Sequence, residues 1–152
     1  MLAASLMSRN PVSVERDHTV LHVSRLMREQ GVGAVVVVDG KGRPIGICTD
    51  RDLTLRAFTA GGDAASLPVD RIMTKPVHTV DEDTLLFDLL RLMAKKHIRR
   101  MPVVHPQTRA LVGIVSMDDV ILFVTTELGN VADVLGHSSR ALGSGDAEGE
   151  EE

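Results

Sequence analysis

The sequence contains no tryptophan, no tyrosine and only three phenylalanines among its 152 residues. Proteins that hold single-stranded nucleic acid stack its bases on aromatic side chains and track its backbone with a basic surface. The net charge of −4 supplies no such surface, and five of the acids, Asp146, Glu148 and residues 150–152, lie together at the C-terminal end. We therefore expect no nucleic-acid partner.

Cysteine is also scarce, because Cys48 is the only one in the chain. A single cysteine forms no internal disulfide, which fits a reducing compartment, and we expect the cytoplasm. Cys48 stands in an apolar run, so we interpret it as a core residue rather than a nucleophile.

Long hydrophobic runs are missing as well. The longest, residues 32–38, falls far below the roughly 20 residues that span a bilayer. The first seven residues lack a basic segment followed by a long apolar one, so we expect neither a signal peptide nor a membrane partner. The hydrophobic fraction of 43% is nevertheless enough for the core of a globular protein.

What the chain does contain is an internal repeat. Residues 46–53, GICTDRDL, return as residues 113–120, GIVSMDDV. Each copy has a glycine, two apolar residues, a hydroxyl residue and an aspartate three positions after the hydroxyl. This order predicts a short buried strand that turns into a helix, with Thr49 or Ser116 as the N-cap.

The repeated motif has two interpretations. A hydroxyl N-cap with an acid three residues later is close to a capping box, so the motif can be purely structural. The unpaired N–H groups and the positive dipole end at such a junction also suit a bound anion. Because the motif occurs twice, at matched points of a longer repeat, we favour a duplicated binding site.

Both halves show the same order of expected elements, strand–helix–strand–strand–helix, with apolar strands of the kind that are covered on both faces. For the first half, we expect strands near 12–14, at 35–38 and at 45–48, and helices at 20–30 and 50–59. For the second half, we expect strands near 77–80, at 101–104 and at 111–115, and helices at 85–96 and 118–128. The predicted fold class is α/β (α+β).

We assign residues 6–61 to the first repeat and residues 72–128 to the second, with a glycine-rich break between them. Neither repeat is long enough to bury a good core alone, so the two should pack on each other about a pseudo-twofold axis. After residue 128 the apolar pattern fades. We expect residues 129–152 to form a C-terminal segment that ends in a disordered acidic tail.

Two repeats of this length, each closed by the pattern G-h-h-[ST]-x-x-D, strongly resemble the pair of CBS domains called a Bateman module. The segments 33–39, 46–53 and 98–104 look like signatures of that family. The resemblance implies a stand-alone, non-catalytic regulatory module with two β-α-β-β-α repeats. It would bind an adenosine compound of the AMP, ADP or ATP class in clefts between the repeats and signal to an unknown protein partner, with no required cofactor.

The resemblance also implies roles for single residues. Asp52 and Asp119 would accept hydrogen bonds from ribose hydroxyls, while Thr49 and Ser116 would bind phosphate or ribose. Backbone groups of the first strands would face the adenine edge, near Ser13, Val14, Thr79 and Val80.

Arg99 and Arg100 occupy the place where phosphate-binding members of the family often carry basic residues. Their counterparts in the first repeat are Gly33 and Ala34, which supply no charge. We therefore expect two unequal clefts. The stronger phosphate site is expected to combine Ser116, Asp119, Arg99 and Arg100.

The sequence gives little evidence for a metal site or for an active site. His18 and His22 are four residues apart, a spacing that can hold a metal, but no third ligand is evident nearby. No nucleophile, base and acid can be assembled from the strand ends either. We expect no metal site and no enzymatic activity.

Two alternatives to the nucleotide sensor remain. One is a constitutive dimerisation or assembly module in which the aspartates only cap helices, and the other is a sensor of S-adenosylmethionine or NAD. A homodimer is expected, because one 16.4 kDa unit cannot cover all the apolar positions of its helices. The positions concerned are Leu53, Phe58, Val120, Phe123 and Val124.

Overall fold

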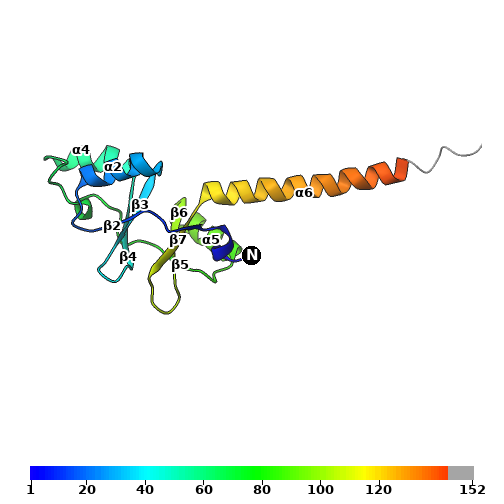
Figure 1. Cartoon of the computed structure of the whole chain (residues 1–152), viewed down its shortest axis with the longest axis horizontal. Coiled ribbons are helices and arrows are strands. Elements are labelled where there is room, and N and C mark those ends of the chain that lie inside the picture. The colour runs from blue at the N-terminus through cyan, green and yellow to red at the C-terminus, as the bar shows by residue number, and fades with distance from the viewer. Residues whose placement is uncertain (144–152) are drawn as a thin grey trace, which may run out of the picture. The chain divides into compact units, whose positions relative to one another are not determined.

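A computed structural model describes the backbone of residues 1–143 (Figure 1). It describes the side chains of residues 1–136. The chain divides after Ser116 into two units. The first unit holds two β-sheets and their covering helices. In its described part, the second unit is a single helix, α6 (Met117–Gly143).

The first sheet belongs to the first repeat and has three strands. β2 (Ser13–Glu15) pairs in parallel with β3 (Ala34–Val38), and β3 pairs antiparallel with β4 (Pro44–Thr49). The central residues of β3 are fully buried, as expected for a strand covered on both faces. The connection between β2 and β3 is α2 (Val20–Gln30).

Helix α2 begins and ends where its sequence predicts. The Thr19 hydroxyl caps it by accepting a hydrogen bond from the backbone N–H of His22, and Gly31 ends it with a φ of 64°. Its buried residues lie in the same core cluster as Cys48 and Val35. Burial raises the pKa of the Cys48 thiol to about 12, which fits a core residue.

The second helix of the first repeat is irregular. α3 (Asp50–Asp52), the π-helical segment η1 (Leu53–Ala57) and α4 (Phe58–Ala60) follow one another without a break. Together they cover the expected helix at 50–59.

The second sheet contains the strands of the second repeat, β5 (Val80–Asp81), β6 (Arg100–Val104) and β7 (Leu111–Ser116). With β1 (Ser8–Arg9) added, its strand order is β1-β7-β6-β5, and α5 (Leu86–Lys96) connects β5 to β6. The added edge strand, β1, comes from the N-terminal segment of the chain. The mixed α+β fold with two repeated sheets is therefore confirmed.

The segments that precede the two repeats are exchanged between them. The N-terminal segment, with α1 (Ala3–Leu6) and β1 (Ser8–Arg9), lies on the second repeat, where β1 pairs antiparallel with β7. The linker before the second repeat, with the 3₁₀ turn η2 (Val69–Arg71), lies on the first repeat instead. There Thr74 exchanges two backbone hydrogen bonds with Ile47 of β4, at 2.8 and 3.1 Å.

Each exchanged segment places a methionine over the glycine of the repeated motif. A Cβ added to Gly46 would overlap Sδ of Met73, and a Cβ added to Gly113 would overlap Sδ of Met7. Both methionines are buried. The two glycines thus give room for a side chain from the other repeat's leading segment.

Helix α6 is longer than the sequence analysis expects. The prediction ends the helix at residue 128, where Gly129 and Asn130 interrupt the apolar pattern, but the helix continues to Gly143. A glycine inside a helix costs only about 1 kcal/mol, and apolar residues return at Val131, Val134 and Leu135. The acidic tail expected to be disordered, residues 144–152, lies outside the described residues.

Among residues 1–143, none of the helices combines the length and the apolar character needed to cross a membrane.

Candidate functional site

A cavity of about 320 Å³ lies between the two repeats of the first unit. One wall is the junction of β4 with α3, and the other is the turn between α5 and β6. The linker contributes Thr74. The lining residues are Ile47, Thr49, Asp50, Arg51, Asp52, Arg56, Thr74, His97, Ile98, Arg99 and Arg100.

Thr49 and Asp52 form a reciprocal capping box at the head of α3. The Thr49 hydroxyl accepts from the backbone N–H of Asp52 at 3.2 Å. In return, Oδ2 of Asp52 accepts from the backbone N–H and from the hydroxyl of Thr49, both at 2.9 Å. The first copy of the motif therefore forms the capping box that its sequence suggests.

The other carboxylate oxygen of Asp52 is also occupied. Oδ1 lies 3.3 Å from Nη1 of Arg56 and 3.4 Å from the hydroxyl of Thr74, and the residue is only 7% exposed. A carboxylate offers about four acceptor positions, so Asp52 is saturated by protein donors. A ribose that binds Asp52 has to displace Arg56 or Thr74.

Arg56 is a site residue that the sequence analysis missed. Its Nη1 donates to the carbonyl of Ile72 at 3.0 Å and to the hydroxyl of Thr74 at 3.1 Å, in addition to its ion pair with Asp52. Arg56 thus connects η1 to the linker that precedes the second repeat. The signal in the sequence is its position four residues after Asp52, which places the two side chains on one helix face.

The cavity is rich in cationic side chains. Four arginines line it against two aspartates, Asp50 and Asp52, which gives it a formal charge of +2. Within the described part of the chain, the guanidinium groups of Arg51, Arg99 and Arg100 have no hydrogen-bond or ion-pair partner. A concave site with unpaired guanidinium groups suits an anion such as phosphate.

Arg100 reaches from the second repeat to the first. A Cβ built on Gly33 would lie 3.0 Å from Nη2 of Arg100 and 3.3 Å from Oδ2 of Asp50. Gly33 therefore leaves the space that the guanidinium occupies. The glycine at this position, which in the sequence alone indicates only missing charge, thus leaves room for the arginine from the other repeat.

The two arginines line a cavity together with residues of the first repeat. Arg99 and Arg100 share it with Thr49 and Asp52, whereas the prediction combines them with Ser116 and Asp119. Arg100 also lies directly opposite Ser116 in the β6–β7 pair, so the predicted combination stays a prediction. The mutual packing of the repeats sets the α5–β6 turn of one opposite the β4–α3 junction of the other.

The remaining predicted residues do not line this cavity. Val14 and Val80 are buried in their sheets, and Ser13 is exposed on β2. The Thr79 hydroxyl accepts from Nη2 of Arg109 at 3.1 Å. Ser116 ends β7 and Asp119 lies in the first turn of α6. Their roles in binding stay predictions.

His18 and His22 have the sequence spacing of two metal ligands. The rings of His18 and His22 lie 4.8 Å apart, and Nδ1 of His18 accepts from the backbone N–H of Glu15. No three histidine, cysteine, aspartate or glutamate residues of the described region come close enough together to hold a metal ion.

A family model described as "CBS domain" matches residues 3–57 and 69–126. The uncharacterised protein MK0525 of Methanopyrus kandleri is 37% identical over 113 residues, which cover 74% of this chain and 57% of that protein. This chain thus spans little more than half of that relative's length.

Solved structures show the same fold. The cytosolic domain of the Mg²⁺ channel MgtE in complex with ATP aligns with a TM-score of 0.67 and 34% identity, over 79% of this chain and 47% of that one. The CBS domain pair of protein MJ0100, in complex with 5′-methylthioadenosine and S-adenosyl-L-methionine, aligns with a TM-score of 0.74 and 23% identity, over 84% and 98%. The two matched segments and the two repeated sheets lead to one conclusion: this chain belongs to the CBS-domain family and carries a tandem pair of these domains.

Proposed function

We propose that the chain is a regulatory module that binds the phosphate groups of an adenosine nucleotide in the cavity beside Thr49 and Asp52. The observation that carries the proposal is the set of three unpaired guanidinium groups, Arg51, Arg99 and Arg100, in one concave site. The cavity volume lies at the lower end of the range for small-molecule sites. The related MgtE domain, named as a complex with ATP, supports the choice of ligand.

The arginines have separate tasks in this proposal. Arg99 and Arg100 approach the phosphate from the second repeat, and Arg51 approaches it from the first turn of the helix opposite. Each planar guanidinium can give two parallel hydrogen bonds to phosphate oxygens. A ligand that contacts both sides holds the repeats together at this cleft.

Asp52 changes partners when the ribose enters. The ribose hydroxyls replace Arg56 and Thr74 at Oδ1, while the bonds of Oδ2 to Thr49 keep the helix capped. Arg56 lines the cavity, so its guanidinium can turn toward the phosphate once the ribose has displaced it from Asp52. Because Arg56 also holds the linker at Ile72, ligand binding alters the hold on the linker and can change affinity for a partner.

A second ligand site at Ser116 and Asp119 remains part of the proposal, as do backbone contacts to adenine near Ser13, Val14, Thr79 and Val80. S-adenosylmethionine and NAD are the competing ligands. The free, buried Cys48 fits a cytoplasmic location.

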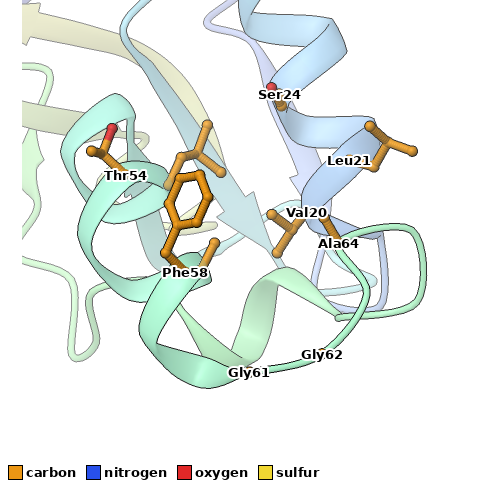
Figure 2. A pocket seen from close by; sticks show the side chains of 10 residues that line it. Val20, Leu21, Ser24, Thr54, Phe58, Gly61, Gly62 and Ala64 are labelled. Carbon is orange, nitrogen blue, oxygen red and sulfur yellow. The ribbon is translucent and has the colours of Figure 1, made fainter.

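The structure also bears on the expected homodimer. Phe58 is 84% exposed and borders an apolar groove of about 350 Å³ between α2 and the continuous η1–α4 helix (Figure 2). Val124 is exposed, Leu53 and Phe123 are half-buried, and Val120 is already buried. We propose that a second copy of the chain covers the Phe58 groove, with self-complementary contacts about a twofold axis.

The alternative function, constitutive assembly without a ligand, is favoured by one observation. Asp52 has all its acceptor positions filled by the protein, as a purely structural cap would. A ligand titration distinguishes the two functions, because only the nucleotide-binding module should respond to the ligand.

The test is the affinity of the purified full chain for ATP, ADP, AMP and S-adenosylmethionine, measured by calorimetry and by thermal shift. A ligand at 100 times its Kd adds about 2.7 kcal/mol, which raises the Tm by roughly 5–10 °C for a domain of this size. Arg99→Ala and Arg100→Ala should each weaken nucleotide binding about 10- to 100-fold, because each removes a charge-assisted hydrogen bond.

The matched control is Arg28→Ala, in the last turn of α2, which is exposed and does not line the cavity. It should leave affinity unchanged. If none of the four compounds moves the Tm at millimolar concentration, the assembly function is supported instead.

A further inference from the structure

Helix α6 carries an exposed apolar seam with heptad spacing. Its 27 residues form one continuous helix of about 40 Å (Figure 1). Large apolar side chains recur along it at alternating intervals of three and four residues and are 44–66% exposed. These residues, here called the seam, are Ile121, Val124, Leu128, Val131 and Leu135.

This spacing is typical of a coiled coil. Residues that alternate at three and four positions occupy the a and d sites of a heptad and form one narrow stripe along a helix. In the sequence, the same register places Met117 before the seam and Ser138 and Leu142 after it. Seven of these eight positions are apolar, over more than three heptads, which is the length at which the pattern predicts helix–helix pairing.

The flanks of the seam permit pairing with an identical helix. Between residues 120 and 135 the e and g positions carry a single charge, Glu127, while Ala132 and Val134 widen the apolar surface. Two identical seams therefore meet without opposed rows of like charge.

The charges of α6 disfavour a lipid surface. From residue 117 to residue 136 the helix carries four acids and neither lysine nor arginine. Helices that lie on membranes combine an apolar face with a basic one.

From these observations we propose that the seam of α6 packs against the seam of α6 from a second copy of this chain. The surface is different from the Phe58 groove, which is formed by α2, η1 and α4 of the first unit. The inference goes beyond ligand binding and does not depend on it.

The experiment compares the mass of the full chain and of two variants by light scattering and sedimentation from 1 to 100 µM. The seam variant is Leu128→Asp with Val131→Asp. The matched control is Leu122→Asp, a residue 68% exposed that lies outside the seam on the same helix. Far-UV circular dichroism and the melting transition verify that both variants fold.

We expect the unmodified chain and Leu122→Asp to associate alike, and the seam variant to associate at least 100-fold more weakly. If the Phe58 groove joins a different pair of copies, about a separate twofold axis, the unmodified chain will exceed a dimer and the seam variant will fall back to a dimer. A monomeric unmodified chain overturns the proposal, whether or not it binds vesicles or another protein. Equal masses for the folded seam variant and the control overturn it as well.

Discussion

The guanidinium of Arg100 lies against the backbone of Gly33, across the contact between the two CBS repeats. A Cβ at Gly33 would approach Nη2 of Arg100 to 3.0 Å and Oδ2 of Asp50 to 3.3 Å. The second repeat thus supplies the charge, and the first repeat supplies the space in which that charge is held. In the proposed site, the position of Arg100 thus depends on Gly33, a residue that has no side chain.

Gly33→Ala therefore tests the position of Arg100 while leaving its charge in place. We expect about 3- to 10-fold weaker binding of ATP, equivalent to roughly 0.7–1.4 kcal/mol, because the guanidinium has to shift. The melting temperature should change little, since the displaced group is the end of a flexible side chain. Gly40→Ala is the control, because a Cβ there meets nothing within 4 Å. Equal affinities of the two variants would refute the steric role.

Gly46→Ala tests the contact between the repeated motif and the exchanged segment. The new methyl group would overlap the buried side chain of Met73, and overpacking of this kind costs about 1–3 kcal/mol of unfolding free energy. Chemical denaturation measures the loss. A double-mutant cycle with Met73→Ala should show that most of it disappears when the methionine is shortened. Additive effects would mean that the glycine serves another purpose.

The fold could be predicted from the sequence because the chain is duplicated. Either copy of the glycine–hydroxyl–aspartate motif alone fits a simple helix cap, but two copies at matched points of a longer repeat define two related sheets. Buried strands such as β3 are recognisable from their unbroken valines. Local patterns of this kind are the strongest part of the prediction.

Features that depend on the other repeat could not be predicted. No local pattern shows that Met73 crosses to Gly46, or that Arg99 and Arg100 line a cavity with Thr49 of the other repeat. Gly129 and Asn130 suggest a helix end, although the packing pattern of α6 continues beyond them. In each case a contact far away in the sequence, or a pattern longer than the interruption, decides the structure.

Asp52→Ala should destabilise the ligand-free chain by about 2–3 kcal/mol. An acid in the first turn of a helix contributes only about 0.3–1 kcal/mol through the dipole, but Asp52 is buried and joins a complete capping box to Arg56. Asp52→Asn keeps an acceptor and should fall between. Apo denaturation and ATP titration on the same variants separate the two roles. A loss of affinity without a loss of stability would contradict the cap.

The turn between β3 and β4 gives a pH-dependent prediction. Hydrogen bonds from the side chain and backbone of Arg43 lower the pKa of Asp39 from its ordinary 3.8 to about 2. A carboxylate with a lowered folded-state pKa stabilises the fold above its unfolded pKa, and this stabilisation is lost as the pH falls from about 4 toward 2. Asp39→Asn should therefore lower the Tm at pH 7, and the difference from the unmodified chain should vanish near pH 2. A difference that persists at pH 2 would show that the charge is not its cause.

The exchange of leading segments has a consequence for how such a chain arose. A polypeptide with one repeat alone would leave its leading methionine without a glycine to cover, and its own glycine without a methionine. Two copies satisfy each other reciprocally, as Met7 with Gly113 and Met73 with Gly46 do here. Duplication and fusion of an ancestral half would have preserved that reciprocity within one gene. A nick in the glycine-rich break between the repeats should accordingly leave two fragments that remain bound, each completing the sheet of the other.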